Sequence, residues 1–160
     1  MTDDRFTHVD TEGEVQMVDV SAKPDVLRQA TAEGHITLRP ETVTAIDDAA
    51  VAKGAVLPTA RIAAIQAVKH TWASIPLCHQ IPITDVDVTL EPTSDGVSIT
   101  VTVATRGPTG CEMEALQGVL TGLAAVWDMV KANEKDSAGQ YPTTRISDVR
   151  VTDKQKQPRD

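Results

Sequence analysis

The most regular pattern in the chain is an alternation of apolar and polar positions in two neighbouring runs, residues 83–90 and 97–103. Alternation with a period of two is typical of a strand that buries one face. In the first run it puts Ile83 on the polar side, together with Asp85. The intervening residues 92–96 combine proline, serine, aspartate and glycine, which favours a turn. The two runs therefore predict a β-hairpin.

Two further strands are expected, one before the hairpin and one near the end of the chain. The even positions of residues 26–38 are mostly small or apolar, which favours a strand, although the stretch from Pro24 also fits the start of a helix. Residues 146–151 alternate again and predict the last strand.

Apolar residues spaced three and four apart predict three helices. The first begins at Pro40 and closes near Gly54, and the second has Pro58 in its first turn and must end before Pro76. The third is the strongest, and its stripe consists of Met113, Leu116, Leu120, Leu123, Trp127 and Val130. Gly118, Gly122 and Ala125 lie on its other faces and let a second backbone come close. We therefore expect this helix to be covered on more than one side, in the core or at a subunit interface.

The order of elements is strand, helix pair, strand, strand, long helix, strand. This order predicts an α+β, ferredoxin-like β-α-β-β-α-β sheet with helices on one face and an extra helical insertion. We expect one domain at residues 15–153, a mobile arm at 1–14 and a polar tail at 154–160. The other face of the sheet is expected to be partly apolar, which favours a homo-oligomer.

Composition excludes several partners. The 160 residues include 41% hydrophobic residues, which suits one domain with a real core, and carry a formal charge of -8. A protein that binds nucleic acid through phosphates needs a surplus of Lys and Arg, so we expect no nucleic acid. No long apolar run and no secretory leader are visible, so we expect no membrane and a cytoplasmic location. The acid surplus suits a cytosol of high salt, or an ordinary acidic protein.

The two cysteines, Cys78 and Cys111, are 33 positions apart in a chain without an export signal, so reduced thiols are expected. Structural zinc sites usually take their four ligands from closely spaced pairs, and the chain has no such pairs. We therefore expect no metal and no cofactor.

Two prolines stiffen the loop at residues 75–82, which presents Cys78 and His79 just before a strand. This loop can be a rigid connector with a buried cysteine and a surface histidine. Alternatively, a histidine held on a stiff loop can donate to an anionic phosphate or act as a general acid or base near neutral pH.

Glu112, Met113 and Glu114 follow a glycine at the start of the longest helix. Acidic residues in a first helical turn are favoured by the helix dipole, which is the simpler explanation. The same side chains can accept hydrogen bonds from the N–H edge of a purine or pterin ring. Chemistry alone does not choose between these explanations.

Asp128 and Lys131 share one face near the end of the same helix. At the surface such a pair contributes well under about 1 kcal/mol, whereas in a cleft both pKa values can be tuned for proton transfer. Lys53, which precedes Gly54, either compensates a helix dipole or adds another cation to a site.

Five segments together resemble the cyclic pyranopterin monophosphate synthase family of molybdenum cofactor biosynthesis. They are residues 17–23, 60–69, 75–79, 110–116 and 128–131. Their order along one chain of matching length makes the resemblance specific, and it spans roughly residues 15–152.

The resemblance implies a lyase that converts a cyclised dihydroguanosine triphosphate to cyclic pyranopterin monophosphate and releases pyrophosphate. It implies a hexamer, a trimer of dimers, with sites at subunit interfaces. Substrate contacts are implied for Leu77, Cys78, His79, Glu112, Met113 and Glu114, and, less firmly, for Lys23. A catalytic role is implied for Asp128, with Lys131 and Lys53 as its cationic partners. The C-terminal segment lacks the glycine-rich ending of many relatives, so no role is implied for Lys154 or Lys156.

Two other classes of protein remain as alternatives to the lyase. A non-catalytic ferredoxin-like module that binds a nucleotide as a regulator would use the same cations but would not need Asp128 beside Lys131. A purely structural oligomerising subunit would need neither feature.

Overall fold

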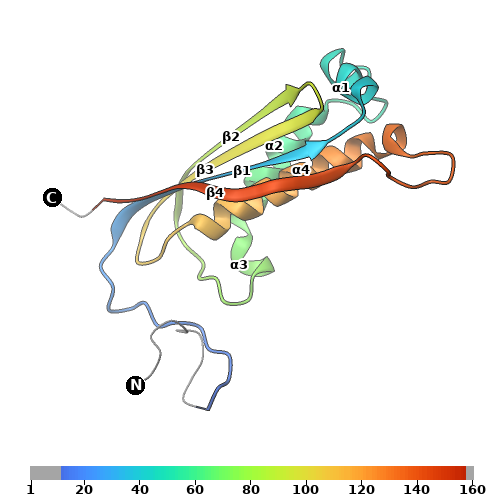
Figure 1. The fold of residues 1–160 in the computed structure, drawn as a ribbon. Helices are drawn as coiled ribbons and strands as arrows, with labels where there is room; N and C mark the ends of the chain where they lie inside the picture. The colour runs from blue at the N-terminus through green and yellow to red at the C-terminus, as the bar shows by residue number, and fades with distance from the viewer. Residues whose placement is uncertain (1–11, 158–160) are drawn as a thin grey trace.

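A four-stranded antiparallel sheet forms one layer of the molecule (Figure 1). The computed structural model describes residues 12–157. The strands are β1 (Val26–Thr37), β2 (Ile83–Thr93), β3 (Gly96–Gly107) and β4 (Arg145–Gln157). Their order is β2-β3-β1-β4, and every neighbouring pair is antiparallel. The predicted α+β, ferredoxin-like fold is thus confirmed.

Helices cover one face of this sheet (Figure 1). The helices are α1 (Pro40–Asp47), α2 (Val56–Lys69), the short α3 (Thr71–Ser74) and α4 (Glu112–Glu134). The two long helices, α2 and α4, lie against the sheet, α1 lies at its end, and α3 packs against α4. The helix pair before β2 is the predicted insertion. None of the helices within residues 12–157 has the length and apolar character that a membrane crossing requires.

Small residues let α2 and α4 pack closely. A Cβ atom added at Gly118 would lie 2.8 Å from a methyl group of Val68, and one at Gly122 would lie 3.3 Å from the Cβ of Ala64. The prediction that the glycines of the long helix admit a second backbone is therefore confirmed. Because the contact uses small residues, α2 buries Ala60 and Ala64 and leaves Ile62 exposed.

The long helix buries a different stripe from the one expected. Leu123 and Val130 are buried, but Met113 and Leu120 are 41% and 44% exposed. Within one chain the core covers the face with Gly118 and Gly122 and only part of the predicted stripe. Large apolar side chains therefore lie on the outer surface of the helix layer.

The open face of the sheet is polar rather than partly apolar. The side chains of Val97, Ile99, Val101 and Val103 all pack beneath the helices, while the exposed side of β2 carries Asp85, Asp87, Thr89 and Glu91. A register shift after Ile83 turns that side chain toward the core, so its expected place beside Asp85 is wrong. Apart from Leu27 on β1, the open face therefore offers little apolar surface for an oligomer interface.

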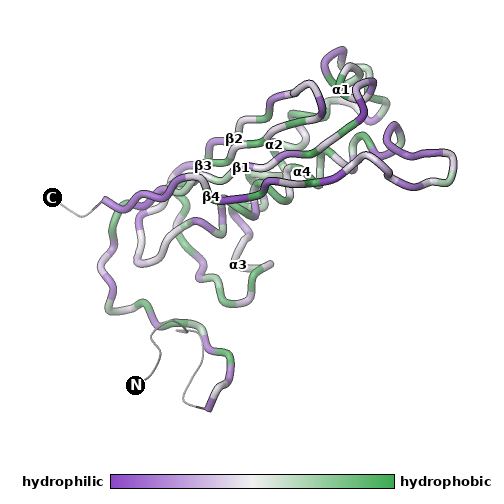
Figure 2. Tube along the Cα trace, viewed as in Figure 1, coloured by the Kyte–Doolittle hydropathy of each residue, from purple (hydrophilic) through white to green (hydrophobic). Residues whose placement is uncertain are grey.

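Three boundaries differ from the expected ones. The first helix ends at Asp47, and Ala49 has a positive φ of 53°, so Lys53 lies in a loop rather than at a helix end. A break at His70 separates α2 from α3. The last strand continues to Gln157 and includes residues 154–157 of the expected tail, because β1 pairs with it as far as Leu27. Figure 2 shows the end of this strand as a hydrophilic segment. Residues 1–11 of the expected mobile arm lie outside the described residues.

Candidate functional site

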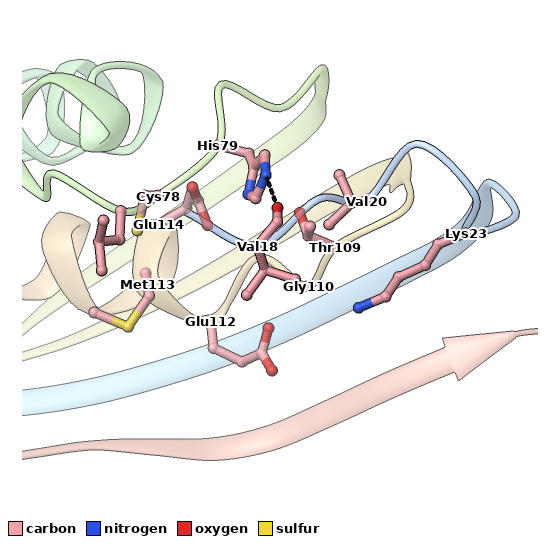
Figure 3. A pocket seen from close by; sticks show the side chains of 11 residues that line it. Val18, Val20, Lys23, Cys78, His79, Thr109, Gly110, Glu112, Met113 and Glu114 are labelled. Carbon is pink, nitrogen blue, oxygen red and sulfur yellow. Dashed lines mark hydrogen bonds between the residues drawn. The ribbon is translucent and has the colours of Figure 1, made fainter. Parts of the chain in front are cut away.

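One cavity of about 360 Å³ gathers all six residues expected to contact a substrate. It lies where the start of α4 meets the loop before β2 and the segment before β1 (Figure 3). Its lining consists of Val18, Val20, Lys23, Leu77, Cys78, His79, Thr109, Gly110, Glu112, Met113 and Glu114. Residues from three separate parts of the sequence therefore form one site.

The start of α4 is anchored to the sheet, which fixes the carboxylates of its first turn. Cys111 is buried, and its Sγ donates to the carbonyl of Val103 at 3.2 Å. The Glu112 carboxylate lies against Gly110, where an added Cβ would displace it from its present position. These contacts hold Glu112 and Glu114 at the cavity wall.

Glu114 is 4% exposed, and burial raises its pKa to about 6, with a smaller contribution from the nearby charge of Glu112. A carboxyl group with this pKa exchanges protons near neutrality. Burial also raises the pKa of the Cys78 thiol, and the charge of Glu114 raises it further. Cys78 is therefore a neutral thiol at neutral pH, which is a poor nucleophile.

Lys154 of β4 forms an ion pair with Glu112. Burial alone would raise the pKa of Glu112, but the hydrogen bond from Lys154 and the charges of Lys154 and Arg28 lower it overall. The two cavity carboxylates thus differ, since Glu112 is ionised while Glu114 titrates near neutrality. Lys154 had no role implied for it, because the C-terminal segment lacks the glycine-rich ending of many relatives.

The segment before β1 closes one side of the cavity. The Nε2 atom of His79 lies 2.8 Å from the carbonyl oxygen of Val18, as the dashed line in Figure 3 shows. Val18 and Val20 add apolar surface, and Lys23 adds a cation. The two valines were not predicted, although both lie in the first of the five segments that carry the family resemblance.

The three residues expected to be catalytic form a second cluster. Lys53 Nζ donates to the Asp128 side chain at 2.9 Å and to the Asp128 carbonyl at 2.7 Å. Lys131 Nζ donates to the other carboxylate oxygen at 2.7 Å. The loop position of Lys53, which sequence analysis missed, is what lets it reach across to α4.

This cluster is open to solvent, and the side chain of Asp128 is 58% exposed. The hydrogen bonds from Lys131 and Lys53 lower the pKa of Asp128 to about 2. The hydrogen bond to Asp128 raises the pKa of Lys131. The cluster therefore carries one anion and two ammonium groups at neutral pH.

The cavity and the cluster lie toward opposite ends of α4. Glu114 and Asp128 are separated by 14 positions on the same helix, which corresponds to about 21 Å along its axis. Within one chain the structure brings the six substrate residues together and the three catalytic residues together, but it keeps the two groups apart.

The cavity combines apolar side chains with a lysine, a histidine and two carboxylates. Such a lining suits a ring whose N–H edge needs acceptors and that carries an anionic group. The ferredoxin-like fold and this cavity together define a small-molecule-binding α+β domain.

Comparison with known proteins narrows this class. The sequence model of the MoaC family matches residues 17–157, and the chain belongs to the MoaC family. It is 59% identical to the probable cyclic pyranopterin monophosphate synthase of Natronomonas pharaonis over 98% of both chains. It is 57% identical to the protein of the same name from Halobacterium salinarum, over 96% of this chain and 94% of the relative. A Methanospirillum hungatei protein of that name is 56% identical over 95% of this chain and 97% of the relative.

Proposed function

We propose that the protein is a lyase of molybdenum cofactor biosynthesis, a cyclic pyranopterin monophosphate synthase. Its substrate is the cyclised dihydroguanosine triphosphate, and its products are cyclic pyranopterin monophosphate and pyrophosphate. The observation that carries this proposal is the single cavity that holds Leu77, Cys78, His79, Glu112, Met113 and Glu114. Family membership and the names of the relatives support it. The free cysteines, Cys78 and Cys111, support a cytoplasmic location.

Different cavity residues bind different parts of the substrate. Glu112 and Glu114 accept hydrogen bonds from the N–H groups of the ring, while Met113 and Leu77 contact its apolar surface. Lys23 neutralises charge on the triphosphate. When the cyclic phosphate forms, a sugar hydroxyl oxygen attacks the first phosphorus, the bond to the second phosphate breaks, and pyrophosphate leaves. The hydroxyl proton passes to a base, and the negative charge of pyrophosphate requires cations.

The pKa of Asp128 is lowered and the pKa of Glu114 is raised, and this difference supports different roles for the two carboxyl groups. With a pKa of about 2, Asp128 is a weak base that stays ionised and orients Lys53 and Lys131. The two lysines then neutralise the leaving pyrophosphate. With a pKa of about 6, Glu114 is better matched to proton transfer near neutral pH.

We further propose that the active oligomer is a hexamer, a trimer of dimers, in which one subunit supplies the cavity and its neighbour supplies the Lys53, Asp128 and Lys131 cluster. The separation of these groups along α4 supports sharing between subunits, because a single substrate cannot reach both groups within one chain. The exposed apolar side chains of the helix layer, Ile62, Met113 and Leu120, support burial by a second copy.

The test is pyrophosphate release from the cyclised substrate by the purified protein. We expect wild-type turnover and a loss of at least about 100-fold in kcat for Asp128→Asn and Lys53→Ala, since one preorganised charge contributes on that order. Asp87→Asn on the open face of β2 and Lys135→Ala after α4 are matched controls and should retain activity. Binding of the substrate without turnover by the folded wild type, at low and high salt, would favour the regulatory module instead.

A further inference from the structure

A strap formed by residues 17–23 crosses the cavity beside His79 (Figure 3). The strap has no helix or strand, and a turn shapes it, in which Lys23 N donates to Val20 O at 3.0 Å. Val18 and Val20 are half-buried, whereas their neighbours in the strap are exposed. The strap therefore rests on the cavity through two valines and through the hydrogen bond at Val18.

That hydrogen bond determines which nitrogen of the His79 ring carries the hydrogen. A backbone carbonyl only accepts, so His79 Nε2 must carry the hydrogen at 2.8 Å from Val18 O. In the neutral ring, Nδ1 is then the nitrogen with a lone pair. Protonation of Nδ1 would leave the Nε2–H donor in place, so the bond to the strap persists in both charge states.

The loop that carries His79 is itself held in place. Cys78 N donates to Ile75 O at 3.0 Å, and Thr105 Oγ1 donates to Pro82 O at 2.7 Å. Two prolines, Pro76 and Pro82, restrict the same loop. His79 is thus the fixed partner of the contact, and the strap is the part that can move.

We propose that His79 is a positioning residue that latches the strap through its Nε2–H. This inference rests on the proposed function, because the latched strap forms the wall that the ring and the triphosphate need. Val18 and Val20 give that wall an apolar surface, and Lys23 adds the cation. The latch keeps all three side chains at the cavity before substrate arrives, which lowers the ordering cost of binding.

Two amide substitutions separate the two ring nitrogens. A glutamine at position 79 places its NH₂ group where Nε2 lies, and an asparagine reaches only as far as Nδ1. We expect His79→Gln to keep the latch and His79→Asn to lose it. Thermolysin, which cuts before valine, should cleave substrate-free His79→Asn at Val18 or Val20 about five-fold faster than wild type, the factor of one typical net hydrogen bond. Circular dichroism and thermal melting of both variants confirm folding.

Turnover provides the second readout. His79→Asn should raise KM about five-fold with kcat nearly unchanged, and His79→Gln should restore KM to within about two-fold of wild type. Equal cleavage of wild type and His79→Asn would overturn the latch. So would a loss of kcat in His79→Gln as large as in His79→Asn, since that would make the ring itself the reacting group. The cleavage assay uses no substrate, so it tests the latch even if the proposed lyase activity fails.

Discussion

Glu114 is the more deeply buried of the two cavity carboxylates, and its ionisation is linked to folding. Its pKa rises from the ordinary 4.5 to about 6 because the folded protein buries it. The protonated form is favoured in the folded state, so the stability from this group is fully present below pH 4.5 and is lost as the pH rises through 6. This rise in the pKa corresponds to a change of about 2 kcal/mol in the free energy of unfolding.

We therefore predict that Glu114→Gln, which cannot ionise, gains stability relative to wild type as the pH rises. The difference in free energy of unfolding between the two proteins should shift by about 2 kcal/mol in favour of the variant between pH 4.5 and 7.5. Urea denaturation at fixed protein concentration measures it. Glu91→Gln, on the exposed face of β2, is the control and should track wild type. A difference that stays constant with pH would contradict a raised pKa at Glu114.

At the scale of elements, the contact between α2 and α4 depends on the absence of side chains. A Cβ at Gly122 would lie 2.5 Å from Ile99 Cδ1, and Ile99 is buried in the core and cannot easily move. Overpacking of this kind costs about 1–3 kcal/mol, whereas alanine gains about 1 kcal/mol in helix propensity.

We predict that Gly122→Ala lowers the free energy of unfolding by up to about 2 kcal/mol, because the clash with Ile99 outweighs the gain in helix propensity. Urea denaturation checks this value. Gly107→Ala is the matched control, since the nearest atom to its added Cβ is 3.9 Å away. Its stability should stay within about 0.5 kcal/mol of wild type. A stabilised Gly122→Ala protein would mean that the helices can move apart at little cost.

The contact between α2 and α4 shows which features of the fold can be predicted from the sequence and which cannot. Alternation and spacing predicted the element order and the antiparallel hairpin correctly, because those patterns follow directly from strand and helix geometry. They did not predict which face of α4 turns inward. Met113 and Leu120 belong to the predicted apolar stripe but are exposed, whereas Gly118 and Gly122 face the core, where close backbone packing excludes large side chains.

The candidate site was predictable where the family resemblance covered it. The distance between Glu114 and Asp128 can also be predicted from the sequence, because both residues lie on one predicted helix. Lys154 was not predictable, since an edge strand with exposed polar residues on both sides has no hydrophobic alternation to reveal it. Pairing with β1, which only the fold shows, brings Lys154 to Glu112.

At the scale of the whole molecule, the cavity and the cluster lie too far apart to form one site within one chain. Activity measurements on mixed oligomers can test whether two subunits share each site. If each site takes its cavity from one subunit and its Lys53, Asp128 and Lys131 cluster from another, a defect in either part can be complemented. Glu114→Gln chains keep an intact cluster, and Asp128→Asn chains keep an intact cavity. A mixed oligomer then contains some sites built wholly from unaltered parts.

We predict that co-expressed Glu114→Gln and Asp128→Asn chains recover about a quarter of wild-type turnover, because random assembly pairs an intact cavity with an intact cluster in that fraction of sites. Each variant alone should have far lower activity, and mixing after separate purification should recover activity only as fast as subunits exchange. Pyrophosphate release by the co-purified oligomer measures the recovery. If co-expression recovers nothing while both variants remain folded and associated, each site lies within one chain.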